Sequence, residues 1–140
     1  MSHDPAAPEA KASVLIVDDE ADNRELLEVI FAWAGFNVTA ASSGKAALAS
    51  VALHPPDIIL LDVMMPNMDG YEATAALRAL PASRDIPVVL VSAFADSSSR
   101  SRGLAAGANE FLTKPVDRVA IVACVRRLVH ERQAQPGRSS

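Results

Sequence analysis

The chain is poor in the residues that build disulfides, thiolate metal sites and membrane spans. It has a single cysteine, Cys124, which excludes an internal disulfide and a zinc site built from cysteines. No apolar run reaches the roughly 18 residues of a membrane span. The first ten residues have neither the basic nor the apolar region of a signal peptide. Its three histidines lie far apart without metal-ligand spacing: His3, His54 and His130. We therefore expect a soluble, cytoplasmic protein.

The chain also lacks an excess of positive charge. It has 13 Lys and Arg against 17 Asp and Glu, a formal net charge of −4, and no long basic run. Nucleic-acid-binding modules present a basic face, so this balance argues against that role. The 140 residues are 50% hydrophobic and 21% charged, a globular composition with the size of one domain. We expect a flexible leader over 1–12, the domain over 13–131 and a flexible tail over 132–140.

Short apolar runs alternate with segments of helical periodicity along the domain. The apolar runs predict five buried strands, at 13–17, 37–40, 57–61, 87–91 and 110–113. Between the first two strands, an apolar stripe predicts a helix that ends at Gly35. The stripe is formed by Leu26, Leu27, Ile30 and Phe31. The other helices are predicted near 44–53, 70–80, 96–106 and 116–130. Strict alternation of strand and helix predicts an α/β fold, a doubly wound parallel sheet with helices on both faces.

Polar side chains follow four of the predicted strands at their carboxyl ends. They are Asp18 and Asp19 after the first strand, Asp62 after the third, Ser92 after the fourth and Lys114 after the fifth. In a doubly wound sheet, the carboxyl ends of the strands form the functional crevice. Each residue alone has an ordinary explanation, such as a helix cap for Asp18 or Asp19. Together they predict three carboxylates, a hydroxyl and an ammonium group at one edge of the sheet.

The chemistry of this predicted cluster favours a cation and a phosphoryl group. Three carboxylates within a few ångströms repel one another. Oxygen ligands without nitrogen or sulfur suit a hard ion such as Mg²⁺, which keeps water ligands and accepts phosphate oxygens. Lys114 adds a second positive charge and Ser92 adds a hydrogen-bond donor. A carboxylate can itself attack phosphorus and form an aspartyl phosphate.

Four motifs occur in order, each after its own strand. They are Asp18-Asp19, the run Asp62-Val-Met-Met-Pro-Asn-Met-Asp-Gly70, Ser92-Ala93 and Lys114-Pro115. Together these motifs resemble the receiver domain of bacterial two-component response regulators, the CheY-like family, over about residues 13 to 131. The resemblance implies a flavodoxin-like (βα)5 fold with strand order 2-1-3-4-5. It also implies a phosphorylation-dependent signalling switch of a two-component or phosphorelay system.

The resemblance implies a phosphoacceptor and a metal site. Asp62 would accept the phosphoryl group. Mg²⁺ (or Mn²⁺) would be bound by Asp19, Asp62 and the backbone carbonyl of Met64, and Asp18 would act through a bound water. The protein would not be an enzyme in the ordinary sense. It would catalyse its own phosphotransfer and a slow autodephosphorylation.

The resemblance also implies a switch and two tuning positions. Lys114 would pair with the phosphoryl oxygens and precede a cis peptide bond to Pro115. Ser92 would move to hydrogen-bond the phosphoryl group, and Phe111 would turn inward as Ser92 moves. This turn would change the surface of the segments 96–106, 110–113 and 116–130. The tuning positions, Met64 and Phe94, are apolar and cannot position a water by hydrogen bonding, so we expect slow loss of phosphate.

The partners implied are a sensor histidine kinase or a histidine phosphotransfer protein, and an unknown downstream protein. The surface of the segments 96–106, 110–113 and 116–130 could also form a homodimer. Neither nucleic acid nor membrane is expected to bind. Since no effector domain is expected after the last helix, the output would be docking. The chain could be free-standing or part of a larger regulator or hybrid kinase. The open alternative is a receiver-like interaction module that works without phosphate.

Other phosphate-handling classes lack their signatures in this chain. A nucleoside triphosphatase needs a glycine-rich loop that ends in Gly-Lys-Ser/Thr, but Ala46 follows Gly44-Lys45. A haloacid-type phosphatase needs a second Asp two residues after the first, where this chain has Met64. A flavodoxin-type cofactor domain needs a hydroxyl- and glycine-rich loop after the first strand, where acidic residues stand. The nucleoside triphosphatase is therefore rejected, and the missing signatures argue against the other two classes.

Overall fold

A computed structural model describes residues 11–94 and 96–134. Its five strands are all parallel and form one sheet in the order β2-β1-β3-β4-β5. The strands are β1 (Ser13–Val17), β2 (Asn37–Ala41), β3 (Ile58–Asp62), β4 (Val88–Ser92) and β5 (Glu110–Thr113). This topology confirms the predicted α/β fold and strand order. β3 and β4 begin and end one residue later than predicted, so Asp62 and Ser92 are the last residues of their strands.

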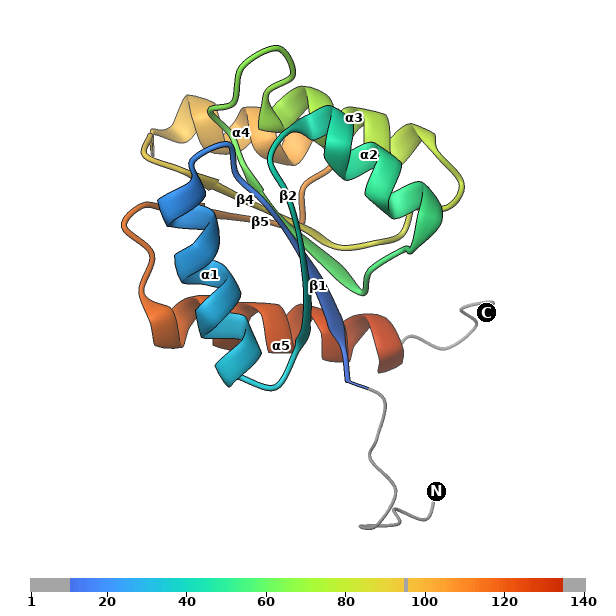
Figure 1. Cartoon of the computed structure of the whole chain (residues 1–140). Coiled ribbons are helices and arrows are strands. Elements are labelled where there is room, and N and C mark those ends of the chain that lie inside the picture. The colour runs from blue at the N-terminus through green and yellow to red at the C-terminus, as the bar shows by residue number, and fades with distance from the viewer. Residues whose placement is uncertain (1–10, 95, 135–140) are drawn as a thin grey trace, which may run out of the picture.

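Five helices cover both faces of the sheet (Figure 1). They are α1 (Ala21–Trp33), α2 (Gly44–Leu53), α3 (Gly70–Ala79), α4 (Ser97–Ala106) and α5 (Arg118–Ala134). α1 and α5 pack on one face, and α2, α3 and α4 on the other. Alternate residues of each central strand enter the two cores, so β1, β3 and β4 are buried on both faces. Among the described residues, no helix has the length and apolar character to cross a membrane.

The last helix is longer than its sequence pattern predicted. α5 continues to Ala134, past the predicted end at His130, so residues 132–134 are helical and do not belong to a tail. The residues after His130 are good helix formers, and the next proline is Pro136. The rest of the predicted tail (135–140) and most of the predicted leader (1–10) lie outside the described residues.

Side-chain caps start four of the five helices. The Ser43 hydroxyl accepts a hydrogen bond from the Ala46 amide at the start of α2, and Asp69 forms a capping box with Glu72 at α3. Asp96 and Asp117 accept bonds from amides in the first turns of α4 and α5. At α1 the cap residue is Glu20, and its side chain caps nothing. The acidic pair before α1 is therefore not used as a helix cap.

Candidate functional site

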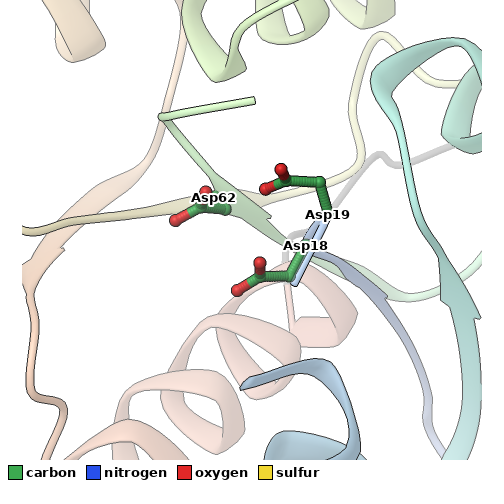
Figure 2. A group of neighbouring side chains, drawn as sticks. All are labelled: Asp18, Asp19 and Asp62. Atoms are coloured by element: carbon green, nitrogen blue, oxygen red, sulfur yellow. The ribbon is translucent and has the colours of Figure 1, made fainter. Parts of the chain in front are cut away.

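Three carboxylates meet at the carboxyl edge of the sheet. Asp18, Asp19 and Asp62 each have an oxygen within 4.8 Å of the others. Figure 2 shows Asp18 and Asp19 after the end of β1 and Asp62 at the end of the neighbouring β3. Asp18 and Asp62 are buried, with exposed fractions of 2% and 5%, whereas Asp19 is exposed. Two of the three negative charges are thus removed from water, and the third lies at the mouth of the site.

Local hydrogen bonds fix the chain around Asp18. Its amide donates to the carbonyl of Ala41 in β2, at 3.2 Å. Its side-chain Oδ1 accepts from the Glu20 amide at 2.9 Å, and its carbonyl accepts from the Arg24 guanidinium at 2.8 Å. These bonds hold the turn between β1 and α1. They leave Asp18 Oδ2 on the side of Lys114.

Lys114 brings a positive charge between the two buried carboxylates. Its Nζ lies 2.7 Å from Asp62 Oδ1 and 3.6 Å from Asp18 Oδ2. Its amide donates to the carbonyl of Ser92, which holds the end of β5 against β4. The structure has the predicted cis peptide bond between Lys114 and Pro115. The ammonium group therefore reaches across the edge of the sheet from the fifth strand to the third and the first.

Burial and the neighbouring charges shift the pKa values of Asp62 and Lys114. Burial raises the pKa of Asp62 from 3.8 to about 6, and repulsion by Asp18 and Asp19 adds to this rise. The hydrogen bond from Lys114 opposes it. Burial alone would lower the pKa of Lys114, but its contacts with Asp62 and Asp18 raise it. Lys114 thus stays charged at neutral pH, and one ammonium does not fully compensate three carboxylates.

The segment after β3 holds the Asp62 backbone against the start of α3. A Cβ atom on Gly70 would lie 2.7 Å from the Asp62 carbonyl oxygen and 2.8 Å from Val63 Cα. Only glycine permits this approach without a backbone shift. The Gly70 amide also donates to the Val63 carbonyl at 2.9 Å. Sequence reasoning included Gly70 in a motif but did not identify this packing role.

Ser92 ends β4, and the two apolar tuning positions follow β3 and β4 in the chain. Ser92 is 1% exposed, and its hydroxyl oxygen accepts from the Phe94 amide at 3.1 Å. The hydroxyl proton is left to donate to another acceptor. Met64 and Phe94 are 58% and 56% exposed. Met64 lines an open cleft of about 360 Å³ together with Asp19, Asp62 and Lys114, and Ala93 lines the same cleft next to Phe94.

The Phe111 ring points inward in this structure. It is 4% exposed and lies in the core with Leu90, so its turn as Ser92 moves stays a prediction. A Cβ atom on Gly103 would lie 3.0 Å from the ring, so this glycine of α4 makes room for it. A phenyl ring has no hydroxyl group, so its burial leaves no hydrogen-bonding group without a partner.

Arg100 of α4 was not identified from the sequence. Its guanidinium lies 5.5 Å from the centroid of the Phe111 ring and donates to the Phe111 carbonyl at 3.2 Å. It also donates to Thr113 Oγ1 at 3.4 Å. An arginine in a serine-rich helix has the pattern of a solvated charge, so no sequence signal indicates this contact. Arg100 connects α4 to β5 next to the site.

Comparisons of sequence with known proteins point to one family. The model of the response regulator receiver domain matches residues 14–126. The chain is 47% identical over 117 residues to the response regulator PleD of Caulobacter vibrioides. This alignment covers 84% of the chain and 26% of PleD, so the chain spans about a quarter of that relative's length.

Comparisons of structure agree with this match. The chemotaxis protein CheY4 of Vibrio cholerae has a TM-score of 0.82 at 30% identity, over 85% of this chain and 99% of CheY4. The receiver domain of the sensor histidine kinase PA1611 of Pseudomonas aeruginosa PAO1 has a TM-score of 0.80 at 31% identity, over 86% of this chain and 99% of that domain. That domain has a magnesium ion coordinated in its active site cleft.

Proposed function

This chain belongs to the response regulator receiver domain family of two-component systems, and we propose that it is a switch operated by phosphorylation of Asp62. The observation that carries the proposal is the arrangement of charges at the sheet edge. Asp62 is buried beside two further carboxylates, and one of its oxygens contacts the Lys114 ammonium at 2.7 Å. Such a cluster is suited to hold a divalent cation and a phosphoryl group together.

The residues at the site fit Mg²⁺. Three carboxylate oxygens lie within 4.8 Å of one another, and the donor set contains no nitrogen or sulfur. Asp19, Asp62 and the backbone carbonyl of Met64 would hold the ion, and Asp18 would act through a bound water. When bound, the ion supplies charge compensation to the phosphoryl oxygens. Mn²⁺ has the same ligand preference and is an alternative occupant.

The proposed transfer uses a carboxylate as nucleophile. An oxygen of the ionised Asp62 attacks the phosphorus atom of a phosphohistidine on the donor protein. The new O–P bond forms as the P–N bond breaks, and the donor imidazole leaves with the electron pair. Lys114 can then pair with a phosphoryl oxygen, and the Ser92 hydroxyl can donate to another. The donor would be a sensor histidine kinase or a histidine phosphotransfer protein.

The output is proposed to be a changed surface of α4, β5 and α5. The Phe111 ring is buried in this structure, and its inward orientation is proposed to accompany the movement of Ser92. The hydroxyl of Ser92 now accepts from the Phe94 amide. If Ser92 turns towards the phosphoryl group, this hydrogen bond breaks and the chain between β4 and α4 loses a constraint. α4 would then move relative to β5, and a downstream protein would bind the new surface.

The rate of phosphate loss is proposed to depend on Met64 and Phe94. Both side chains are apolar and largely exposed, so neither can orient an attacking water. We expect Met64→Asn and Phe94→Glu to accelerate autodephosphorylation, measured as the decay of the phosphorylated protein after the phosphodonor is removed. Unchanged decay in both variants would contradict this role.

Intact mass spectrometry tests the proposed function. The chain is incubated with acetyl phosphate in Mg²⁺ or in EDTA, beside Asp62→Asn and the control Asp85→Asn, which changes an exposed aspartate outside the cluster. One phosphoryl adduct is expected for the wild type and for Asp85→Asn in Mg²⁺ only, and none for Asp62→Asn. An adduct on Asp62→Asn would refute the assignment of the acceptor. No adduct on the folded wild type, also with candidate kinases, would favour an interaction module that works without phosphate.

A further inference from the structure

An exposed apolar groove lies between α1 and α5, on the face of the sheet that these helices cover. It has a volume of about 600 Å³, and its lining is apolar except for Arg118 and Arg126 of α5. Trp33 is 87% exposed, Val119 75%, Leu26 60% and Val29 55%. Trp33 is also the single tryptophan of the chain. Contiguous apolar surface of this kind on a small domain marks an interaction site.

These side chains are not needed to attach α1 to the sheet. Leu27 and Phe31 perform that task, with exposed fractions of 8% and 0%. Leu26, Val29 and Trp33 follow one another at helical spacing on a different face of α1. The groove therefore offers a second apolar face that the domain itself leaves uncovered.

The two helices beside the groove carry opposite charge. α1 has Asp22, Glu25 and Glu28 against Arg24 alone, a formal charge of −2. On α5, Arg118 and Arg126 line the groove, whereas Arg127 is paired with Glu110 and Glu131 at 2.8 and 3.4 Å. A hydrogen bond of 2.8 Å from the Arg126 guanidinium to the Ala34 carbonyl ties the two helices together. The face is thus acidic on one side of the groove and basic on the other.

We propose that this face binds a second copy of the chain. A twofold axis along the groove places the acidic α1 of each copy against the basic α5 of the other, with the apolar side chains between them. A partner with one sign of charge would be attracted by one helix and repelled by the other. The surface is therefore complementary to itself. This dimer differs from one through α4, β5 and α5.

The size of the face predicts a weak dimer. α1 has 13 residues, so a two-helix face is about 20 Å long and about 20 Å wide. Its contact area is on the order of 500 Å² per copy, below that of a standard stable interface, so we expect a dissociation constant on the order of 100 µM. The dimer forms and separates with concentration, and it does not depend on the proposed phosphorylation of Asp62.

Sedimentation velocity of the unphosphorylated full chain, from about 5 to about 500 µM, tests this proposal. We expect the weight-average sedimentation coefficient to rise from the monomer to the dimer value. Trp33 emission should shift to the blue over the same range, because the ring becomes buried. A monomer at every concentration would overturn the proposal. Blue-shifted emission at the lowest concentration without a dimer would also overturn it, because a segment of the same chain would then cover the groove.

Substitutions locate the interface. Trp33→Ala should raise the dissociation constant by about tenfold or more. Leu104→Ala changes a leucine on α4 that is 58% exposed, and it should leave the dissociation constant unchanged. The reverse result would place the dimer on α4 and refute the groove. Circular dichroism of each variant confirms that it is folded.

Charge reversal tests the pairing of opposite helices. Glu25 and Arg118 are exposed on α1 and α5. Glu25→Lys or Arg118→Glu alone should weaken the dimer, because like charges then meet. An equimolar mixture of the two variants should associate more strongly than either variant alone, because each Lys then faces a Glu in the other copy. No recovery in the mixture would contradict the twofold arrangement.

Discussion

The carboxyl edge of the sheet has two sides that are held in different ways. On the side of β1 and β3, the start of α3 lies against backbone atoms of Asp62 and Val63. On the side of β4 and β5, α4 lies against side chains, since a Cβ on Gly103 would meet Leu90 and Phe111 side-chain atoms at 3.0 Å. Backbone contacts cannot yield without moving a strand, whereas side chains can change rotamer.

The buried residues of the two helices show the same difference. α3 buries five residues, Gly70, Tyr71, Ala73, Thr74 and Leu77, whereas α4 buries Gly103 alone. α4 is attached mainly through polar and ring contacts. Arg100 lies over Phe111, Arg102 lies 4.3 Å from the centroid of the Tyr71 ring, and the Tyr71 hydroxyl donates to Ser99. α3 is thus held by buried packing, whereas α4 is held mainly by contacts at its surface, and such contacts open more easily.

Alanine at two glycines tests this difference with the largest expected effect. Gly70→Ala should lower the free energy of unfolding by about 3 kcal/mol, because its Cβ clashes with backbone. Gly103→Ala should change it by less than about 1 kcal/mol, since Leu90 and Phe111 can adjust and alanine favours the helix. Urea denaturation measures both. Equal losses would show that the two sides are equally rigid.

Removal of the Lys114 charge should disturb the carboxylate side next most strongly. Lys114→Met leaves Asp62 and Asp18 without their ammonium partner, so we expect a loss of about 2 kcal/mol in stability without divalent cations. Mg²⁺ should restore part of this loss, because it supplies positive charge at the same place. The control is Lys45→Met, at an exposed position on α2. If both variants had the same stability in urea, Lys114 would not stabilise the cluster.

The raised pKa of Asp62 predicts a dependence of stability on pH. The pKa is about 6 in the fold and 3.8 for the free side chain, so the ionised carboxylate destabilises the fold above pH 6. Below 3.8 the carboxyl is protonated in both states, and the penalty disappears. In metal-free buffer, Asp62→Asn should therefore be more stable than the wild type by about 1 kcal/mol at neutral pH. Urea denaturation across this pH range should show the gain vanish in acid. A gain that is constant with pH would contradict the raised pKa.

The smallest effect is expected on the side of α4. Arg100→Ala removes a cation–π contact with Phe111 and a hydrogen bond to its carbonyl, both at an exposed arginine. We expect a loss of about 0.5–1 kcal/mol, measured by thermal denaturation. A loss as large as that of Gly70→Ala would mean that α4 is held as firmly as α3.

The residues of the carboxylate side could be predicted because topology alone brings them together. Parallel strands end at the same edge, so Asp18, Asp19, Asp62 and Lys114 meet regardless of detailed packing. Their residue types then indicate the chemistry. Gly70 was only part of a motif, because the distance between α3 and the Asp62 carbonyl depends on the path of the loop.

The residues of the other side could not be predicted in the same way. The burial of Phe111 depends on its rotamer and on the space above Gly103, which are set by contacts between α4 and β5. The contact with Arg100 follows from the same packing. On α1, the sequence pattern grouped Leu26 with Leu27, but the phase of the helix on the sheet exposes Leu26 and buries Leu27. Such details depend on tertiary structure and not on periodicity.

The buried carboxylate of Asp62 is proposed to be the group that accepts phosphate. Borohydride reduction of the protein after treatment with acetyl phosphate and Mg²⁺ tests it most directly, because an acyl phosphate is reduced to an alcohol. Peptide mass mapping should find homoserine at position 62 and unmodified Asp18 and Asp19. Homoserine at position 18 or 19, or a phosphoryl group that resists reduction, would contradict phosphorylation of Asp62.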